Sequence, residues 1–282
     1  YKVTDAKGSI SSMADWDYIS TVHDAGMEIW PLISDFTSID ADAGWDEAKL
    51  FANTASRRNL ISNIINEIKT YGYDGINIDF EKVPSDSAVD YRQFIRELSI
   101  ECRKAGVVFS LDNYVPRPYN AQYSRDVQAE CADYVVVMGY DEHYAGGDEA
   151  GSVASIDFVT DGIDGTLKEV PKEKLINALP FYTRLWMEST DENGNVKLSS
   201  KTYSMQGALD IVAELGTGME WDEEVGQYVA FGEVDGVKYS IWLEEDESIK
   251  AKMKVVRERE LAGISGWCLG MEKPSVWDVI TE

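Results

Sequence analysis

The chain has 282 residues, and its 51 Asp and Glu outnumber its 26 Lys and Arg, which gives a formal net charge of −25 at pH 7. A chain of this length can bury one large core, and α/β barrels of this size often fold as one domain. The acidic excess argues against nucleic-acid binding, because phosphate backbones require clustered Lys and Arg.

Several other classes of protein are disfavoured by missing sequence features. The sequence has no apolar run long enough to span a membrane, no signal peptide at its start, no P-loop and no G-x-G-x-x-G after a strand. His23 and His143 are the two histidines, so we expect neither a histidine-rich zinc site nor a cofactor. The scattered Cys102, Cys131 and Cys268 lack C-x-x-C spacing, and we interpret them as ordinary thiols that say little about compartment.

Predicted helices and strands alternate along most of the chain. In order, they are a helix at 15–25, a strand at 27–33, a helix at 53–69, a strand at 73–81, a helix at 87–104, a strand at 107–112, a helix at 126–132, strands at 134–138 and 176–182, a helix at 248–260 and a strand at 263–269. The helical stretches carry apolar residues at helical spacing. This alternation predicts an α/β fold with a parallel sheet and right-handed crossovers.

The predicted strand at 73–81 is the most informative segment. Its apolar residues alternate with polar ones, and successive side chains of a strand point to opposite faces. The polar face carries an amide and two carboxylates, Asn77, Asp79 and Glu81. Charged groups inside a parallel sheet are costly unless they have a task, and ligands bind where parallel strands end in loops. The alternative is an edge strand with one solvated face.

The segment from Asp74 to Glu81 reads Asp-Gly-Ile-Asn-Ile-Asp-Phe-Glu. It is similar to the signature DGxDxDxE of glycoside hydrolase family 18, the chitinase family. Within that family, the chain resembles the bacterial cell-wall and spore-cortex branch. Three further segments resemble family motifs in the family's order: Met138-Gly139-Tyr140-Asp141, Leu179-Pro180-Phe181-Tyr182-Thr183-Arg184-Leu185-Trp186 and Gly263-Ile264-Ser265-Gly266-Trp267. These motifs cover nearly the whole chain.

The resemblance implies a (β/α)8 TIM-type barrel. In the family the signature lies on the fourth strand, whereas one clear strand and a short tail at residues 1–3 precede it here. We therefore expect the chain to begin inside the family domain, without its first strand or strands. Residues 188–243 break the alternation and carry hairpin signals, so we expect an α+β insertion between barrel segments 1–187 and 244–282, forming one wall of a cleft.

The resemblance also implies catalytic roles. Glu81 would be the general acid that protonates the leaving oxygen, and repulsion from the neighbouring Asp79 would help to keep a proton available. Asp79 would hold the nitrogen of the substrate's 2-acetamido group, whose oxygen is the nucleophile. Tyr140 would donate a hydrogen bond to that oxygen, Asp141 would bind the distorted sugar, and Trp267 would lie under the ring.

The remaining substrate-binding residues that we predict are Asn77, Asp74, Tyr182, Arg184, Trp186 and Met138. Core packing is the alternative role for Tyr140 and Trp267, and it is the stronger one for Tyr182, Trp186 and Trp30. Asn77 stands where the family has a middle aspartate, which argues against a mechanism in which the second carboxylate moves between two acidic neighbours. A metal held by Asp74, Asp79, Glu81 and Asp141 is conceivable, although the same residues are explained without one.

We therefore expect a glycosidase that acts on glycans containing N-acetylglucosamine, either peptidoglycan or chitin oligomers, by a substrate-assisted retaining mechanism. The competing function is a sugar-binding barrel that has lost catalysis, although such proteins usually lose the acid and Glu81 is present. We expect a monomer, as part of a longer multidomain chain, that is secreted or associated with the cell wall or spore.

Overall fold

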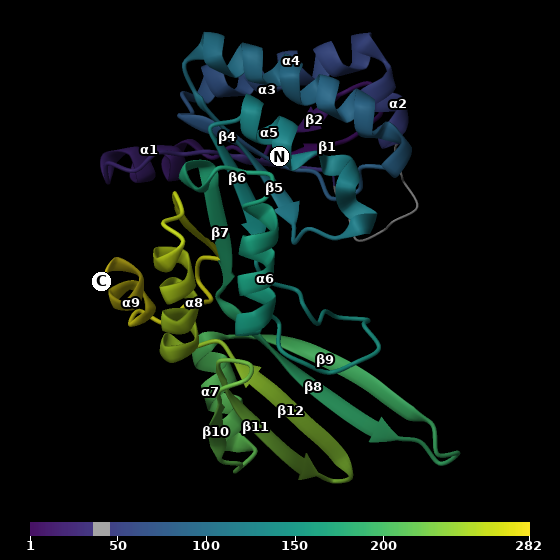
Figure 1. Cartoon of the computed structure of the whole chain (residues 1–282), viewed down its shortest axis with the longest axis vertical. Helices are drawn as coiled ribbons and strands as arrows, with labels where there is room; N and C mark the ends of the chain where they lie inside the picture. Colours follow the sequence, from purple (N-terminus) through teal and green to yellow (C-terminus); the bar gives the residue numbers. More distant parts are fainter. Residues whose placement is uncertain (36–45) are drawn as a thin grey trace. The chain divides into compact units, whose positions relative to one another are not determined.

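The computed structural model describes residues 1–35 and 46–282 (Figure 1). The chain divides into two compact units. The first contains Tyr1–Val137 and Thr166–Leu175, and the second contains Met138–Gly165 and Ile176–Glu282. No helix in this described part of the chain is both long enough and apolar enough to cross a membrane.

The first unit is a sheet covered by helices. Its strands are β1 (Lys2–Val3), β2 (Ile10–Ser11), β3 (Leu32–Ser34), β4 (Gly75–Asp79), β5 (Val108–Tyr114) and β6 (Tyr134–Met138), in the order β6-β5-β4-β3-β1-β2. Its helices are α1 (Trp16–Asp24), α2 (Glu47–Ala52), α3 (Thr54–Tyr71), α4 (Ala88–Ala105) and α5 (Arg125–Cys131). Strands β1, β3, β4 and β5 pair in parallel, as the α/β prediction requires, whereas β2 pairs with β1 antiparallel.

Helix α3 shows how local sequence sets an element of this unit. The Asn53 side chain accepts hydrogen bonds from the backbone of Ala55 and Ser56, which caps the helix N-terminus. Gly72 ends the helix in the left-handed region at φ 69°, a conformation that glycine adopts without a Cβ clash. The predicted apolar face of the helix is buried, and it consists of Leu60, Ile61, Ile64, Ile65 and Ile68. The prediction for this helix is confirmed.

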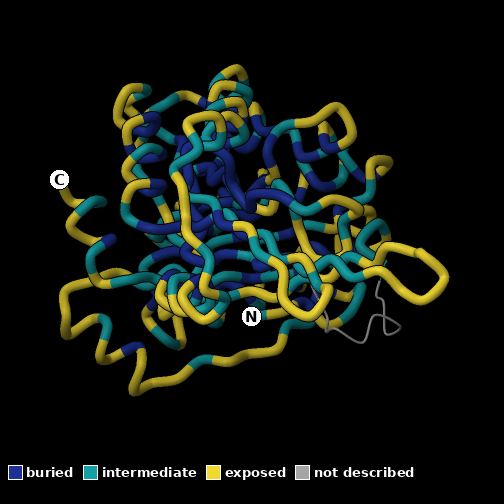
Figure 2. The backbone as a smooth tube through the Cα atoms, turned by 90° about the horizontal axis from the view of Figure 1, so that it is seen from below, coloured by how far each residue is buried: buried dark blue, intermediate teal, exposed yellow. Residues whose placement is uncertain are grey.

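The core of the first unit lies between its helices and one face of its sheet. The buried residues of the chain are dark blue in Figure 2. The apolar residues of the signature strand, Ile76, Ile78 and Phe80, are buried in this core. Phe80 stacks on Phe94 of α4, with ring centroids 5.8 Å apart. The apolar face predicted for this strand is therefore correct, and it fixes which way the polar face of β4 points.

The second unit contains a parallel pair of strands and an antiparallel sheet. Its elements are α6 (Ile156–Thr166), β7 (Leu175–Pro180), β8 (Tyr182–Thr190), β9 (Val196–Ser204), α7 (Met205–Glu214), β10 (Met219–Asp222), β11 (Gln227–Val234), β12 (Val237–Leu243), α8 (Asp246–Glu258), β13 (Gly263–Trp267) and α9 (Val276–Thr281). Strand β13 pairs with β7 in parallel. The antiparallel sheet has the order β10-β11-β12-β8-β9.

The antiparallel sheet contains both hairpins that the sequence predicts. The turn between β8 and β9 is held by Asp191, whose carboxylate accepts from the backbone of Asn193 and Asn195. Between β11 and β12, Asp235 and Gly236 have φ values of 51° and 75°, which is typical of a two-residue hairpin turn. The sheet begins at Tyr182, upstream of the predicted insertion boundary at residue 188.

Some element bounds differ from the predictions. The strand expected at 27–33 is Leu32–Ser34, because Trp30 and Pro31 form an irregular entry in which the Trp30 ring lies against Gly75 and stacks on Tyr134. The strand expected at 176–182 ends at Pro180, and β8 then begins. Helices α2, α6, α7 and α9 were not predicted.

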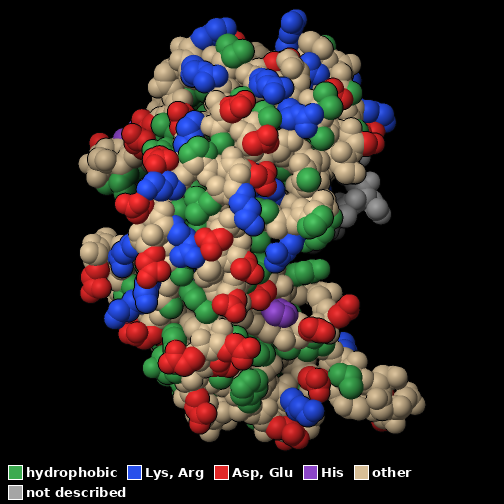
Figure 3. Space-filling view, viewed as in Figure 1, with side chains coloured by type: hydrophobic (Ala, Val, Ile, Leu, Met, Phe, Trp, Pro, Cys, Tyr) green, Lys and Arg blue, Asp and Glu red, His purple; other side chains and the backbone are tan. Residues whose placement is uncertain are grey.

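The charged surface does not gather into a basic patch on the face that Figure 3 shows, where Asp and Glu side chains alternate with Lys and Arg. This distribution gives no sign of the clustered Lys and Arg that binding to a phosphate backbone requires.

Candidate functional site

The polar face of β4 lies between two parallel neighbours in the first unit. Asn77 lies opposite Ser110 of β5 and Leu32 of β3, and Asp79 lies opposite Ser34. The polar residues of β5 that follow Ser110 at alternate positions are Asp112 and Tyr114. Because the strands run in the same direction, their carboxyl ends bring these polar side chains to one edge of the sheet.

The Asn77 amide is oriented by its neighbours on β5. Its Nδ2 donates to Ser110 Oγ at 3.0 Å and to Asp112 Oδ1 at 2.9 Å. The Ser110 hydroxyl donates to the Ile76 carbonyl at 3.4 Å, so it acts as an acceptor toward Asn77. Two acceptors around Nδ2 leave the carbonyl oxygen Oδ1 on the other side, buried and without a hydrogen-bond partner among the described residues.

Asp79 is a proton-binding carboxyl group in this arrangement. Burial, together with the charges of Asp112, Glu81 and Asp35, raises its pKa to about 8. Its Oδ1 is also buried and has no partner in residues 1–35 and 46–282. Burial likewise raises the pKa of Asp112 to about 7, although the hydrogen bond from Asn77 opposes this shift. Near neutral pH this cluster therefore retains a proton.

Asp35, which follows β3, positions the end of the signature strand. It is 1% exposed, and its two carboxylate oxygens accept from the backbone N–H groups of Glu81 at 3.0 Å and Lys82 at 2.7 Å. These bonds hold the backbone where the chain leaves β4 and thus orient the Glu81 side chain. Burial raises the pKa of Asp35, and the two backbone donors act against that rise.

Glu81 is partly buried and contacts a residue of β5. The Tyr114 hydroxyl donates a hydrogen bond to Glu81 Oε2. Burial raises the pKa of the Tyr114 phenol, and the Glu81 carboxylate adds to the effect, so the phenol remains a donor. Glu81, Tyr114, Asp79 and Asp112 together form what we call the carboxylate edge.

Asp74 lies at the opposite end of β4 from Glu81. Its Oδ2 accepts from the backbone N–H of Ile29 at 2.9 Å and lies 3.0 Å from His23 Nε2. These contacts join the start of β4 to α1 and to the segment before β3. The substrate-binding role expected for Asp74 stays a prediction, and the structure gives its carboxylate a local bridging role.

Several predicted site residues lie together in the second unit. The Tyr182 hydroxyl donates to Asp141 Oδ1, and the rings of Tyr140 and Tyr182 lie edge to face with centroids 6.2 Å apart. Asp141 has φ 58°, a left-handed conformation that is uncommon for a residue with a Cβ. This backbone aims the exposed Asp141 carboxylate toward the Tyr182 hydroxyl.

The other predicted residues of this unit differ in exposure. Trp186 is 1% exposed and donates from Nε1 to the Gly151 carbonyl at 2.8 Å, and Met138 is buried, so both have the contacts of core residues. Arg184 donates to Ser200 Oγ at 3.2 Å, while its buried Nε has no partner in the described part of the chain. Trp267 is half exposed at the end of β13, and its substrate-binding role stays a prediction.

Sequence reasoning missed Asp35, Asp112 and Tyr114. The signal for Asp112 was present, because Ser110 and Asp112 alternate with the apolar Phe109 and Leu111, and Tyr114 follows on the same face of this strand. Asp35 had no comparable signal, since its two partners are backbone groups more than forty positions away in the sequence.

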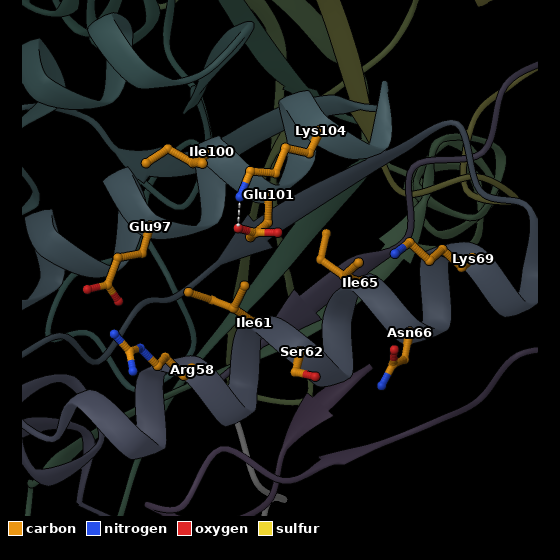
Figure 4. Close-up of a pocket in the computed structure, with 10 residues that line it drawn as sticks. All are labelled: Arg58, Ile61, Ser62, Ile65, Asn66, Lys69, Glu97, Ile100, Glu101 and Lys104. Carbon is orange, nitrogen blue, oxygen red and sulfur yellow. Dashed lines mark hydrogen bonds and ion pairs between the residues drawn. The ribbon is translucent and has the colours of Figure 1, made fainter.

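A separate groove lies between α3 and α4 (Figure 4). Its floor includes Ile61 and Ile65, and Glu101 and Lys104 form an ion pair on its rim with a 2.7 Å contact. No residue of the carboxylate edge lines it. The groove is therefore distinct from the candidate site. Among the described residues, no group of three or more His, Cys, Asp and Glu is arranged to hold a metal ion.

Known proteins are similar to this chain in sequence. The cortical fragment-lytic enzyme of Bacillus subtilis is 26% identical over 256 residues, which cover 87% of this chain and 58% of that protein. A class V chitinase of Lotus japonicus is 24% identical over 274 residues, covering 84% of this chain and 67% of its own. The chain spans little more than half of the length of the Bacillus subtilis relative.

Solved structures of the same kind have the same fold. The spore cortex-lytic enzyme SleL of Bacillus cereus superposes with a TM-score of 0.87 at 20% identity, over 99% of this chain and 65% of that one. A chitinase of Chromobacterium violaceum gives a TM-score of 0.86 at 23% identity, over 100% and 88%. The family model for glycosyl hydrolases family 18 matches residues 42–272, and it implies a TIM-type barrel. The chain belongs to glycosyl hydrolases family 18.

Proposed function

We propose that this chain hydrolyses β-linked glycans that contain N-acetylglucosamine. The observation that carries the proposal is the carboxylate edge, where Asp79 and Glu81 share one face at the carboxyl end of β4 and where burial and mutual repulsion keep a proton bound near neutral pH. Glycoside cleavage needs such a proton for the leaving oxygen and a stabilised oxocarbenium-like centre.

The chemistry that fits this edge is substrate-assisted and retaining. Glu81 gives its proton to the glycosidic oxygen, while the 2-acetamido oxygen of the substrate attacks the anomeric carbon and forms a cyclic intermediate. Asp79 holds the acetamido nitrogen. Water, deprotonated by Glu81, then opens the intermediate and restores the original configuration. Asp35 contributes by fixing the Glu81 backbone, and Tyr114 by holding one Glu81 oxygen.

The roles of the second unit rest on the family motifs. We propose that Tyr140 donates to the acetamido oxygen, that Asp141 binds the distorted sugar and that Trp267 provides an apolar surface for it. The exposed Trp267 ring and the contact between Asp141 and Tyr182 are compatible with these roles. Met138 and Trp186 would support them from the core.

The natural substrate that we favour is peptidoglycan rather than chitin. The names of the relatives support this choice, because a cortical fragment-lytic enzyme and a spore cortex-lytic enzyme are among them, although chitinases are too. The same names support a location at the cell wall or spore. Since the chain is strongly acidic, we expect it to bind anionic wall polymers through short-range sugar contacts.

The test is to incubate the protein with N-acetylglucosamine oligomers, with purified peptidoglycan and with a β-glucan that has no 2-acetamido group, and to measure new reducing ends. We expect products from one or both of the first two and none from the glucan. Binding without cleavage would support the lectin-like alternative instead. Turnover of the glucan would contradict the substrate-assisted mechanism.

Two isosteric variants separate the roles of the carboxylates. Asp79→Asn replaces the carboxyl partner of the acetamido nitrogen by an amide, whereas Glu81→Gln removes only the acid. A thiazoline that mimics the cyclic intermediate should therefore bind more weakly to Asp79→Asn than to Glu81→Gln, as measured by calorimetry. The reverse order would assign the orienting role to Glu81.

A further inference from the structure

The carboxylate edge contains one acidic residue more than the proposed mechanism uses. Asp112 lies on β5, and the register of the two strands, continued by one residue, places it beside Asp79. The family signature has an aspartate two positions before Asp79, where this chain has Asn77. A carboxylate missing from β4 is thus matched by a carboxylate on the adjacent strand.

Geometry links the two positions directly. Asp112 Oδ1 accepts from Asn77 Nδ2 at 2.9 Å, and Ser110 Oγ accepts from the same nitrogen at 3.0 Å. An amide can donate only from its nitrogen, so this pair of acceptors selects one of its two orientations. As a result Asn77 Oδ1, on the face shared with Asp79, is the atom left to accept a hydrogen bond.

The Asp79 carboxyl group can supply a hydrogen-bond donor to match this acceptor. Its buried Oδ1 has no partner among the described residues, and a protonated carboxyl group there would be a donor. The titratable groups that act on Asp79 are Asp112 of β5, Glu81 after β4 and Asp35 after β3. Burial and, to a smaller extent, the charge of Asp79 raise the pKa of the Tyr91 and Tyr123 phenols. Among the charged groups that raise the pKa of Asp79, Asp112 has the largest effect.

We propose that Asp112 is a positioning residue that takes over the task of the carboxylate missing at position 77. It fixes the Asn77 amide with its carbonyl oxygen available, and it places a negative charge beside Asp79, so that Asp79 retains its proton near neutral pH. The inference rests on the proposed function of the edge. It differs from the family arrangement because the charge is on the adjacent strand and acts through Asn77.

The first test measures the titration of Asp79 itself, and it needs no substrate. Carboxyl carbon NMR of the labelled full chain, with the Asp79 signal assigned by its loss in Asp79→Asn, gives the midpoint. We expect Asp112→Asn to lower this midpoint by about one pH unit or more, because a like charge is removed. Asn77→Asp adds a like charge on the same face and should raise it. An exposed residue of α5, changed in Glu130→Gln, is the matched control for loss of one charge and should leave it unchanged.

The second test measures cleavage. Either single variant should reduce the rate of reducing-end release, and the double variant Asn77→Asp/Asp112→Asn, which restores the charge to β4, should recover it to within about tenfold of the original chain. A double variant no better than the poorer single variant would overturn the proposal, as would an Asp79 midpoint that does not move in Asp112→Asn. If the unaltered chain cleaves no glycan, the proposed function fails, and the midpoints still decide whether Asp112 controls the proton on Asp79.

Discussion

Two groups of buried acidic residues differ in how their charge is compensated. In the second unit, Glu244 is fully buried and its carboxylate accepts from Lys252 Nζ at 2.9 and 3.0 Å, from Ser248 Oγ at 2.9 Å and from Gln227 Nε2 at 2.8 Å. In the first unit, Asp79 has a buried oxygen without a partner in the described chain, and burial and three neighbouring carboxylates raise its pKa.

The difference separates a structural site from a chemical one. Glu244 has a counter-ion and hydrogen bonds to its carboxylate, as a buried ion must have if it is to remain charged, and the network ties β11, β12 and α8 together. The carboxylate edge leaves Asp79 Oδ1 without a partner among the described residues, and it binds a proton near neutral pH. Buried polar groups without partners destabilise a fold, and they occur where a bound ligand or a reaction supplies the missing partner.

The largest effect that would test this comparison is expected for Glu81→Gln. The amide keeps the volume and one acceptor but cannot deliver a proton, so hydrolysis should fall by roughly two to four orders of magnitude. Reducing-end release from the preferred glycan measures it, and an unchanged thermal midpoint and sugar affinity are the controls. Near-normal activity of Glu81→Gln would show that the catalytic centre does not lie on β4.

Breaking the Glu244 network should affect stability instead of chemistry. Lys252→Met leaves a buried carboxylate without its cation, which should lower the free energy of unfolding by about 3–5 kcal/mol. Urea denaturation measures the loss. Lys254→Met is the matched control, because Lys254 lies on the same helix with an exposed side chain and should change stability by less than about 0.5 kcal/mol. Equal losses in the two variants would contradict a structural role for the pair.

The carboxylate edge should give stability a distinctive pH dependence. The pKa of Asp79 is about 8 in the folded chain, above the value of about 4 for an unfolded aspartate, so between these values the folded state binds more protons. The Asp79 contribution to stability is therefore present below about pH 4 and is lost as pH rises toward 8. The free energy of unfolding of the original chain should decline relative to that of Asp79→Asn over this range. Parallel pH profiles from urea denaturation would show that Asp79 does not retain its proton.

The smallest effect is expected at Tyr114. Tyr114→Phe removes the hydroxyl that donates to Glu81 and keeps the ring, so the rate should change by about tenfold or less, with a shift in the pH profile. A loss as large as that of Glu81→Gln would make Tyr114 an essential member of the site. Tyr119→Phe, on an exposed ring of the segment after β5, is the control.

The sequence by itself determined the elements whose patterns are local. The apolar spacing of α3 and the alternation of β4 predicted which faces are buried, because a helix and a strand each repeat with a fixed period. The four motifs identified the family, and the alternation on β4 placed Asp79 and Glu81 on one face. Turn residues predicted both hairpins of the antiparallel sheet.

Only the tertiary structure decided which partners surround those residues and how deeply they are buried. The contact of Asn77 with Asp112 depends on the pairing of two parallel strands separated by a helix, and the bonds from Asp35 to the Glu81 backbone depend on a third strand. Burial, which dominates the pKa of Asp79, is likewise a property of the packed unit. Spacing along the chain specifies the side chains on one strand, whereas the proton on Asp79 is set by burial and by the charges that the fold brings from neighbouring strands.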